Sequence, residues 1–297
     1  MSELGARLAR YAAMAEAALE DAVPMPGCEW PERGIPAQLA EAMRYSLLGG
    51  GKRLRPALLL AAYEALRDDV DEALPFCAAL EMVHAYSLIH DDLPAMDNDD
   101  LRRGKPTSHK VFGEAMAILA GDALLNLAFE TMAHSRHPRA LDALRIVAAR
   151  AGSRGMIAGQ AADMLSQGRA PDPGMVRYIH LRTTADLLTA AVTAGLALGG
   201  AGDEQLRAGE EYGRNLGLAF QITDDLLDLT GDAATLGKAA GKDEAEGKMT
   251  WPAAVGRAQA EADAQAFAEA AANAAGAFGR MEGFFAALAR SVPQRVK

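Results

Sequence analysis

Apolar residues recur at intervals of three and four along most of this chain, which is the repeat of an amphipathic α-helix. Val83 and Tyr86 follow the repeat before one acidic cluster, and Ala219, Ile222 and Leu226 follow it at a second. Alanine, leucine, methionine, glutamate and arginine dominate these stretches, and all of them are good helix formers. Runs of β-branched residues are scarce. The pattern therefore predicts an all-α protein.

Glycine, proline and short polar residues interrupt the helical repeat. The predicted breaks lie at residues 24–27, 49–51, 67–71, 97–107, 134–139, 168–174, 199–203 and 230–252. About ten helices remain, joined mostly by short links, so we expect a single helical domain that spans residues 1–297. The alanine-rich segment 253–290 is expected to be helical and to serve packing and a shared dimer face.

Composition narrows the class of protein. The net charge of −10 argues against general nucleic-acid binding, because phosphate contacts need a positive surface. The longest uncharged run, residues 187–202, is shorter than the ~20 residues that span a bilayer, and charges at Glu3 and Glu16 interrupt the N-terminal segment. Cys28 and Cys77 do not make a disulfide framework. We expect a soluble, cytoplasmic protein without a membrane span.

Two acidic clusters, at residues 90–97 and 221–228, carry the most specific chemistry. Carboxylates gathered in this way repel one another unless cations lie between them, and Mg²⁺ binds a few carboxylates together with water and phosphate oxygens. In the second cluster, Asp224 and Asp228 are four apart and project from one helix face. Asp225 lies one position round the helix, where it can support its neighbours or bind a further ion.

The first acidic cluster needs a turn to bring its carboxylates together. Asp91 and Asp97 are six apart, which would leave them on different faces of a continuous helix. Pro94 disfavours helix at the residue before it and lets the chain turn, so Asp97 can return towards Asp91. An ordinary solvated acidic loop remains a good description of Asp99 and Asp100.

Basic residues accompany each acidic cluster. A glycine turn, where backbone can approach an anion closely, precedes the first set. Further pairs follow each cluster, and the same order of acidic and basic groups occurs twice, which favours a diphosphate site over unrelated surface patches. The basic residues are Lys52, Arg53 and Arg55, then Arg102 and Arg103, then Lys238 and Lys248.

The histidines are less specific. His84 lies almost two turns before Asp91, and a ligand contact and a satisfied core histidine are both open for it. His90 adjoins the cluster, where a hydrogen bond to a carboxylate is sufficient. Glu81 and His84 have the Glu-x-x-His spacing of di-iron bundles, but no matching second motif follows. No other histidine has a context that indicates chemistry: His109, His134, His137 and His180.

Together these segments resemble the trans-isoprenyl diphosphate synthases, and in particular the bacterial farnesyl diphosphate synthase type. The likeness covers nearly the whole chain through motifs at residues 50–56, 84–97, 100–107, 159–163, 220–228 and 237–248. The resemblance implies an isoprenoid synthase fold, an all-helical bundle around a central cavity, and a homodimer. Two aspartate motifs together with residues 50–56 favour condensation over terpene cyclisation.

The resemblance also implies a reaction and its residues. Isopentenyl diphosphate condenses with an allylic diphosphate, dimethylallyl or geranyl, as three magnesium ions neutralise the leaving diphosphate. The metal-binding aspartates would be Asp91, Asp92, Asp97, Asp224 and Asp228, with Asp225 as a further catalytic aspartate. The allylic diphosphate would contact Arg102, Lys238 and Lys248; isopentenyl diphosphate would contact Lys52, Arg55, His84 and Arg103; and Gly51, Thr184 and Gln221 complete the substrate-binding set.

Product length depends, in this family, on side chains along the helix before the first aspartate motif. Tyr86 and Ser87 occupy the fifth and fourth positions before Asp91, and a tyrosine ring there would close the floor of the cavity. An insertion of two residues, around Pro94 and Ala95, also fits the bacterial farnesyl pattern. We favour a fifteen-carbon product, with ten- and twenty-carbon products as alternatives.

One position departs from the family pattern. Thr183 occurs where the family usually has a lysine that contacts the allylic diphosphate, and Arg182 lies about 100° round the helix from it. Intact aspartate motifs favour retained catalysis with weaker binding or an altered substrate preference. The alternative is a non-catalytic subunit that binds prenyl diphosphates beside another synthase.

Overall fold

The computed structural model describes residues 2–26, 34–230 and 247–296. The contacts between residues divide the chain into two compact units, residues 1–60 with 70–144 and residues 61–69 with 145–297. Each unit is helical, so the all-α prediction is confirmed. The prediction of one domain over residues 1–297 stays a prediction.

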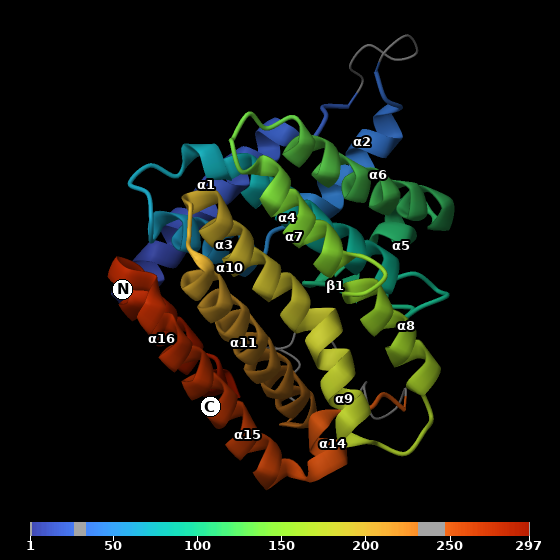
Figure 1. Cartoon of the computed structure of the whole chain (residues 1–297). Helices are drawn as coiled ribbons and strands as arrows, with labels where there is room; N and C mark the ends of the chain where they lie inside the picture. Colours follow the sequence, from blue (N-terminus) through green and yellow to red (C-terminus); the bar gives the residue numbers. More distant parts are fainter. Residues whose placement is uncertain (1, 27–33, 231–246, 297) are drawn as a thin grey trace. The chain divides into compact units, whose positions relative to one another are not determined.

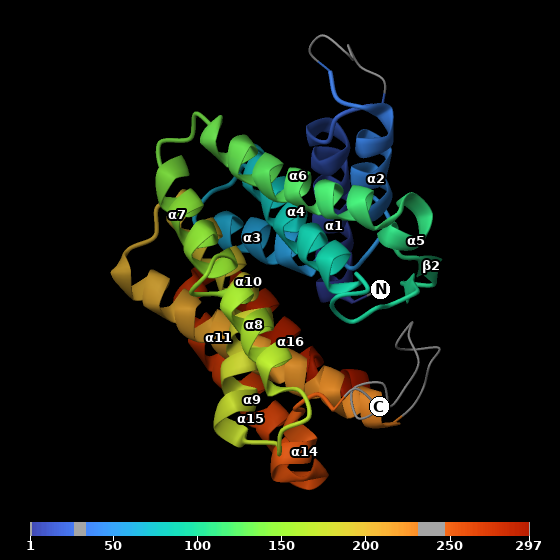
Figure 2. The ribbon, with the colours of Figure 1, turned by 90° about the vertical axis from the view of Figure 1, so that its right-hand side faces the viewer.

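The first unit is built around helix α4 (Leu74–Asp91), which packs along α6 (Glu114–Ala133) in both ribbon views (Figures 1 and 2). α4 is apolar on nearly all sides, and Phe76 and Leu80 are fully buried. The other elements are α1 (Glu3–Ala22), α2 (Ala37–Leu47), the start of α3 (Leu54–Glu64), η1 (Asp71–Ala73), β1 (Leu101–Arg102), β2 (Lys105–Pro106), α5 (Ser108–Phe112) and the start of α7 (Ala140–Ala151).

The second unit is built around α11 (Asp203–Thr230), which packs against α10 (Asp186–Gly199) and α15 (Arg257–Ala274). Every residue of α10 is buried. α15 and α16 (Glu282–Ser291) are helical and pack in this unit, as expected for the alanine-rich tail. The other elements are α8 (Met156–Ser166), α9 (Pro173–His180), η2 (Leu181–Ala185), α14 (Trp251–Val255), η3 (Ala275–Met281) and η4 (Pro293–Val296).

Local sequence signals set many of the helix ends. The hydroxyl of Ser2 accepts the Gly5 N–H at the start of α1, and the carboxylate of Asp172 accepts the Met175 N–H at the start of α9. The predicted breaks at 49–51, 67–71, 134–139 and 199–203 all separate helices. The breaks at Gly113 and Gly256 were not expected; both glycines have a positive φ, near 85°.

The one sheet within the described residues is the two-stranded hairpin of β1 and β2, which the sequence pattern did not predict. Its turn residues, Arg103 and Gly104, both have positive φ, 53° and 75°. A two-residue turn with this conformation matches the twist of antiparallel strands. The hairpin therefore follows the first acidic cluster and presents Arg102 and Arg103 side by side.

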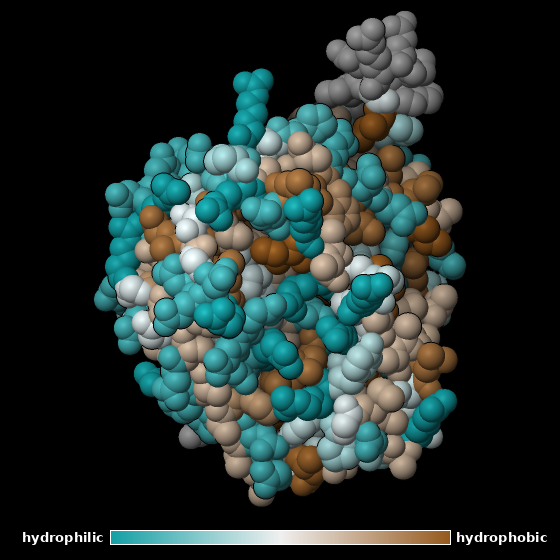
Figure 3. Space-filling model, viewed as in Figure 1, coloured by the Kyte–Doolittle hydropathy of each residue, from teal (hydrophilic) through white to brown (hydrophobic). Residues whose placement is uncertain are grey.

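α6 is the one helix among the described segments that is long and apolar enough, by length and composition, to cross a membrane. It packs against α2 and α4, and buried helices of soluble proteins share these properties. Ile118 and Leu119 on this helix are 43% and 53% exposed. Brown, apolar side chains are visible in the region of α6 in the space-filling view (Figure 3).

Candidate active site

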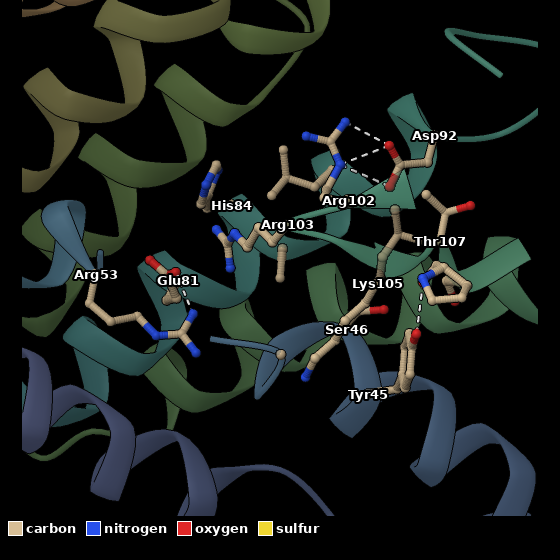
Figure 4. A pocket seen from close by; sticks show the side chains of 16 residues that line it. Tyr45, Ser46, Arg53, Glu81, His84, Asp92, Arg102, Arg103, Lys105 and Thr107 are labelled. Atoms are coloured by element: carbon tan, nitrogen blue, oxygen red, sulfur yellow. Dashed lines mark hydrogen bonds and ion pairs between the residues drawn. The ribbon is translucent and has the colours of Figure 1, made fainter. Parts of the chain in front are cut away.

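The first unit contains a hollow lined by residues of α2, α4 and the β1–β2 hairpin (Figure 4). We call it the basic pocket, because four cationic side chains and one histidine line it: Arg53, Arg102, Arg103, Lys105 and His84. Glu81 and Asp92 also line the pocket, and the rest of the wall includes apolar residues of α4. An anion that enters this pocket would meet positive charge from two separate segments of the chain, Arg53 and the β1–β2 hairpin.

Arg53 organises the wall of the pocket from within. Its guanidinium donates to Glu16 on α1 at 2.7 Å, to Glu81 on α4 at 2.7 Å and to the Leu47 carbonyl at 2.8 Å. Burial alone would lower the pKa of Arg53, but the hydrogen bonds and charges of Glu16 and Glu81 raise it. Arg53 is thus a structural cation, and Glu81 is already ion-paired, which removes the support for a di-iron site.

Gly51 and Arg103 are in direct contact. The Arg103 guanidinium donates to the Gly50 carbonyl, and a Cβ on Gly51 would lie 2.6 Å from its Nη1. Gly51 also has φ 139°, which side chains rarely allow. Glycine is therefore needed here for close approach of backbone to a cation. Of these two predicted substrate-binding residues, Arg103 lines the pocket and Gly51 packs against its guanidinium.

His84 lies beside Arg103 in the basic pocket (Figure 4). Burial, reinforced by the positive charges of Arg55, Arg103, Arg102 and Arg53, lowers the pKa of His84 well below its ordinary value. Its ring makes no hydrogen bond to any residue in the described part of the chain. A neutral imidazole at the wall of a cationic pocket favours the ligand-contact interpretation over that of a satisfied core histidine.

Asp92 faces Arg102 rather than open solvent. The Arg102 guanidinium holds both carboxylate oxygens, with Nε at 2.8 and 2.9 Å and Nη2 at 2.6 Å from Oδ1. Asp92 is 3% exposed, and burial raises its pKa although Arg102 acts in the opposite direction. The predicted metal ligand Asp92 and the predicted allylic contact Arg102 therefore bind one another in this structure.

The first acidic loop turns as the sequence predicts. α4 ends at Asp91, and the Asp97 N–H donates to the Asp91 carbonyl at 2.8 Å. The Met96 N–H donates to the Leu93 carbonyl at 2.9 Å, which closes the turn around Pro94. Asp91 and Asp97 are both half-buried. The loop brings the backbones of the two predicted metal ligands together.

Tyr86, Ser87 and His90 lie on α4 before this loop. Burial, with a smaller effect of Asp91, raises the pKa of Tyr86 to about 12. The Tyr86 ring meets the His90 ring edge-on, with centroids 5.7 Å apart. His90 Nε2 lies 3.1 Å from the Ile118 carbonyl, so His90 faces α6 and not the acidic cluster. Ser87 donates to the backbone of its own helix.

The second acidic cluster lies near the end of α11 in the second unit. Asp224 is half-buried, and Arg295 donates to its Oδ1 at 3.0 Å. The same guanidinium lies 4.5 Å from the centre of the Phe220 ring. Asp228, four residues on, is 4% exposed. The contact of Arg295 with Asp224 has no signal in the sequence, because 71 residues separate them.

Asp225 is buried and faces a different set of groups. Its carboxylate accepts the Trp251 N–H at 2.8 Å and the Gln221 side-chain amide at 3.1 Å, and His180 Nε2 lies 3.2 Å from it. Thr184 in turn donates to the Gln221 amide oxygen at 2.7 Å. Thr184 and Gln221, predicted to bind substrate, thus bind one another. The sequence reasoning missed His180, because only tertiary contacts bring it to Asp225.

The Thr183 position lies in η2, a five-residue π-helical turn between α9 and α10. Such turns are frequent at functional sites. Thr183 donates to the Ile179 carbonyl at 2.9 Å, and Arg182 pairs with Asp186 at 3.1 Å, which Arg150 also contacts. Arg182 is therefore engaged with Asp186 in this structure.

Three lysines and one arginine of the predicted substrate set remain. Lys52 is exposed beside the glycine turn, and Arg55 is half-buried in the first turn of α3. Lys248 is half-buried and lies three residues before Trp251. Lys238 lies outside the described residues. No common site of these residues is described, and their roles stay predictions.

Aspartate oxygens at both motifs suit a hard divalent cation. Within the described segments, however, no three histidine, cysteine, aspartate or glutamate side chains lie close enough together to bind one metal ion by themselves. Mg²⁺ commonly binds one or two carboxylates and completes its shell with water and substrate phosphate. The half-buried Asp91, Asp97 and Asp224 meet that requirement.

A family model, curated proteins and solved structures are all similar to this chain. The sequence model for the family described as polyprenyl synthetase matches residues 36–285. The chain is 50% identical over 231 residues to farnesyl diphosphate synthase of Geobacillus stearothermophilus, across 76% of this chain and 78% of that protein. It is 49% identical over 229 residues to chloroplastic geranylgeranyl pyrophosphate synthase 11 of Arabidopsis thaliana, across 74% of this chain but 64% of that longer protein.

Solved structures share the fold along almost the full length. An FPP/GFPP synthase of Zymomonas mobilis in its apo form has a TM-score of 0.84 and 35% identity, with 98% of each chain covered. A geranyltransferase of Helicobacter pylori, complexed with magnesium and isoprenyl diphosphate, has a TM-score of 0.84 and 30% identity, with 97% of each chain covered.

Proposed function

The chain belongs to the polyprenyl synthetase family, and from that membership we propose that it condenses isopentenyl diphosphate with an allylic diphosphate in a magnesium-dependent reaction. The product is a short-chain trans-prenyl diphosphate, with farnesyl diphosphate favoured. The observation that carries the proposal is the basic pocket, in which Arg103 and neutral His84 lie next to the ion pair of buried Asp92 with half-buried Arg102 at the start of the first acidic loop.

The residues of the basic pocket suit isopentenyl diphosphate. Arg103 supplies positive charge in the pocket, and guanidinium groups bind diphosphate oxygens with paired hydrogen bonds. Lys52 and Arg55, which flank the pocket residue Arg53 in the sequence, are proposed as further contacts. His84 donates a hydrogen bond without adding charge, and Arg103 also donates to the Gly50 carbonyl in the glycine turn. Binding in this pocket orients the double bond and lowers the entropy of the encounter with the allylic carbon.

The acidic residues suit the second substrate. Asp91, Asp97, Asp224 and Asp228 would hold Mg²⁺, which supplies charge neutralisation for the leaving diphosphate. Arg102, Lys238 and Lys248 are the proposed contacts of the allylic diphosphate. The proton released in the condensation leaves with the departing diphosphate.

Tyr86 is the proposed determinant of product length. Its ring is buried and held edge-on against His90, so a growing prenyl chain that reaches this position would stop. We expect Tyr86→Ala to shift the product from fifteen to twenty carbons, and Tyr86→Phe, which keeps the ring, to retain the fifteen-carbon product. Chromatography of the products measures both. An unchanged product from Tyr86→Ala would remove this role.

We further propose a homodimer with α6 at the contact, supported by the exposed apolar side chains Ile118 and Leu119. A cytoplasmic location is proposed from the composition, and a single synthase domain from the continuity of the family match over residues 36–285. The ten- and twenty-carbon products stay as alternatives.

Incubation of the pure protein with Mg²⁺, isopentenyl diphosphate and geranyl diphosphate tests the proposal. We expect farnesyl diphosphate by chromatography, and loss of product when EDTA removes the metal. The variant Asp91→Asn is expected to lose activity by at least about a hundredfold, since catalytic charge stabilisation is worth several kcal/mol. Thr183 favours one second candidate, a non-catalytic prenyl-diphosphate-binding subunit. Absence of any prenyl product from the lone wild-type protein would favour that role.

A further inference from the structure

Asp225 belongs to the second acidic motif, where metal ligands are expected, but its side chain is buried among hydrogen-bond donors of the protein. Asp224 and Asp228 flank it, yet its side chain is only 4% exposed, as is that of His180. Oδ2 receives the Trp251 N–H at 2.8 Å and faces His180 Nε2 at 3.2 Å, and Oδ1 receives the Gln221 amide at 3.1 Å. A buried carboxylate with this many donors is oriented by them and has little freedom to turn.

The groups around Asp225 come from separate elements of the second unit. His180 ends α9, Gln221 is one turn earlier on α11, and the Trp251 amide begins α14. The chain of hydrogen bonds continues from Gln221 to Thr184 in η2. We call these five residues the Asp225 network: His180, Thr184, Gln221, Asp225 and Trp251.

The Asp225 network joins two parts of the proposed allylic site. Trp251 lies three residues after Lys248, so the bond from the Trp251 amide to Asp225 holds residues 248–251 close to α11. Asp224 and Asp228 lie one residue before and three residues after Asp225 on the same helix. Any rotation of α11 that redirected these two carboxylates would also break the contacts of Asp225.

His180 is the histidine of the network, and the proposed reaction assigns it no contact with a metal ion or a substrate. Its Nε2 carries the ring proton in this contact, because a carboxylate can only accept. The His180 ring also packs near the Trp251 indole, with centroids 6.2 Å apart. The indole is fixed in turn by a bond from Nε1 to Asp263 at 2.8 Å.

We propose that His180 is a positioning residue for the second acidic motif, acting through Asp225 to fix the directions of Asp224 and Asp228 and the path of the segment that carries Lys248. Asp225 itself then orients α11 instead of contacting a cation. The inference rests on the proposed function for the role of Asp224 and Asp228 in binding Mg²⁺.

A matched control exists in the first unit. His137 Nε2 lies 3.6 Å from Glu72, and its ring lies edge-on to Phe76 with centroids 6.4 Å apart. This is the same combination of histidine, carboxylate and aromatic ring, and it involves neither acidic motif. His137→Leu therefore reports what the loss of a buried imidazole away from both acidic motifs does to the fold; its Glu72 partner is 70% exposed, and its Nδ1 also accepts the Arg139 N–H.

The experiment compares His180→Leu, His180→Gln and His137→Leu. The first readout is the rise in melting temperature as Mg²⁺ is added in the presence of inorganic pyrophosphate, which needs no turnover. We expect His180→Leu to raise the Mg²⁺ concentration at half-maximal stabilisation by about 10- to 100-fold, the range typical of residues behind a metal ligand. His180→Gln, whose amide can reach Asp225, should stay near the wild-type value, as should His137→Leu.

The second readout is steady-state kinetics with the allylic substrate. His180→Leu is expected to raise its KM and the Mg²⁺ requirement more than it lowers kcat, and His180→Gln to restore both. A His180→Leu protein that melts earlier but responds to Mg²⁺ as the wild type does would overturn the positioning role. Wild-type protein that makes no prenyl product, with the Mg²⁺ response still lost in His180→Leu, would contradict the proposed function and support the positioning role.

Discussion

Two side chains of the basic pocket, His84 and Arg53, differ in how they are held. Arg53 donates to three oxygens within the protein and is 3% exposed, so a ligand cannot recruit it without breaking those bonds. His84 is surrounded by cations and lines the pocket. Burial and, to a smaller extent, the positive neighbours make protonation of this imidazole unfavourable in the folded state, so the stability of the protein depends on pH.

The first prediction concerns that dependence. The folded pKa of His84 lies below the unfolded value near 6.5, so the unfolded state binds more protons as the solution becomes acidic. The contribution of neutral His84 to the free energy of unfolding is complete above about pH 6.5. It is lost as the pH falls, and the free energy of unfolding then decreases by up to about 1.4 kcal/mol per pH unit. Urea unfolding of wild type and His84→Asn at pH 7.5 and 5.5 measures it. A smaller difference between the two pH values is expected for His84→Asn, and an equal difference would show that His84 does not contribute.

The second prediction concerns Thr183. A lysine at this position adds a charge-assisted contact to the allylic diphosphate, so Thr183→Lys should lower the KM for geranyl diphosphate by about tenfold, the equivalent of ~1.4 kcal/mol. Steady-state kinetics measures it. Thr183→Met, with a similar stem and no charge, is the control and should not lower the KM. An unchanged or raised KM in Thr183→Lys would show that another group has taken over this contact.

Among the helices and strands, the β1–β2 hairpin shows most directly how backbone conformation sets the position of charged side chains. Its turn places Arg102 against Asp92 and Arg103 against the glycine turn at residues 50 and 51, and it depends on positive φ at Arg103 and Gly104. Glycine adopts this conformation without strain, whereas alanine does not. The position of two cations therefore depends on a residue that has no side chain.

The third prediction follows from this turn. Gly104→Ala should destabilise the protein by about 1 kcal/mol and raise the KM for isopentenyl diphosphate several-fold, because a strained turn displaces Arg103. Gly256→Ala is the matched control: it also has positive φ and open space around it, and it separates α14 from α15. Urea unfolding and steady-state kinetics measure the two effects. If both variants change KM equally, the hairpin has no special role.

Sequence reasoning found the elements because glycine, proline and apolar periodicity act locally. It found the turn at Pro94 for the same reason, since proline restricts its own φ and the residue before it. It did not find the hairpin, because Arg103 is not a residue expected at positive φ. Nor did it find Arg53 as an internal cation, the bond of Arg295 to Asp224, or the contact of His180 with Asp225. Most of these contacts join residues that are 37 to 71 positions apart in the sequence; the bonds of Arg53 to Glu81 and to the Leu47 carbonyl span shorter distances. No local sequence pattern predicts such contacts.

For the whole molecule, the exposed part of α6 is the feature that suggests assembly. α6 is mostly apolar, and its polar residues Asp122, Asn126 and Glu130 are spaced four apart along one stripe of the helix. Ile118 and Leu119 remain exposed after α6 has packed against α4. A second copy of the chain would remove these side chains from water.

The fourth prediction tests this contact. Leu119→Lys should shift the protein from dimer to monomer in size-exclusion chromatography with light scattering, because it places a charge in an apolar interface. The matched control is Leu165→Lys on α8, which is 71% exposed and should leave the mass unchanged. A wild-type protein that is already monomeric at micromolar concentration would rule out the proposed dimer.

The ion pair between Glu16 and Arg53 has a practical consequence for anyone who alters the beginning of this protein. Glu16 sits on α1, a helix without any chemistry of its own, yet it is one of three anchors of the cation that shapes the pocket wall. A shortened gene product that begins after this helix would therefore lose more than stability. Arg53 would lose one of its three hydrogen-bond partners, and we expect the protein to bind its substrate poorly even if it could be purified.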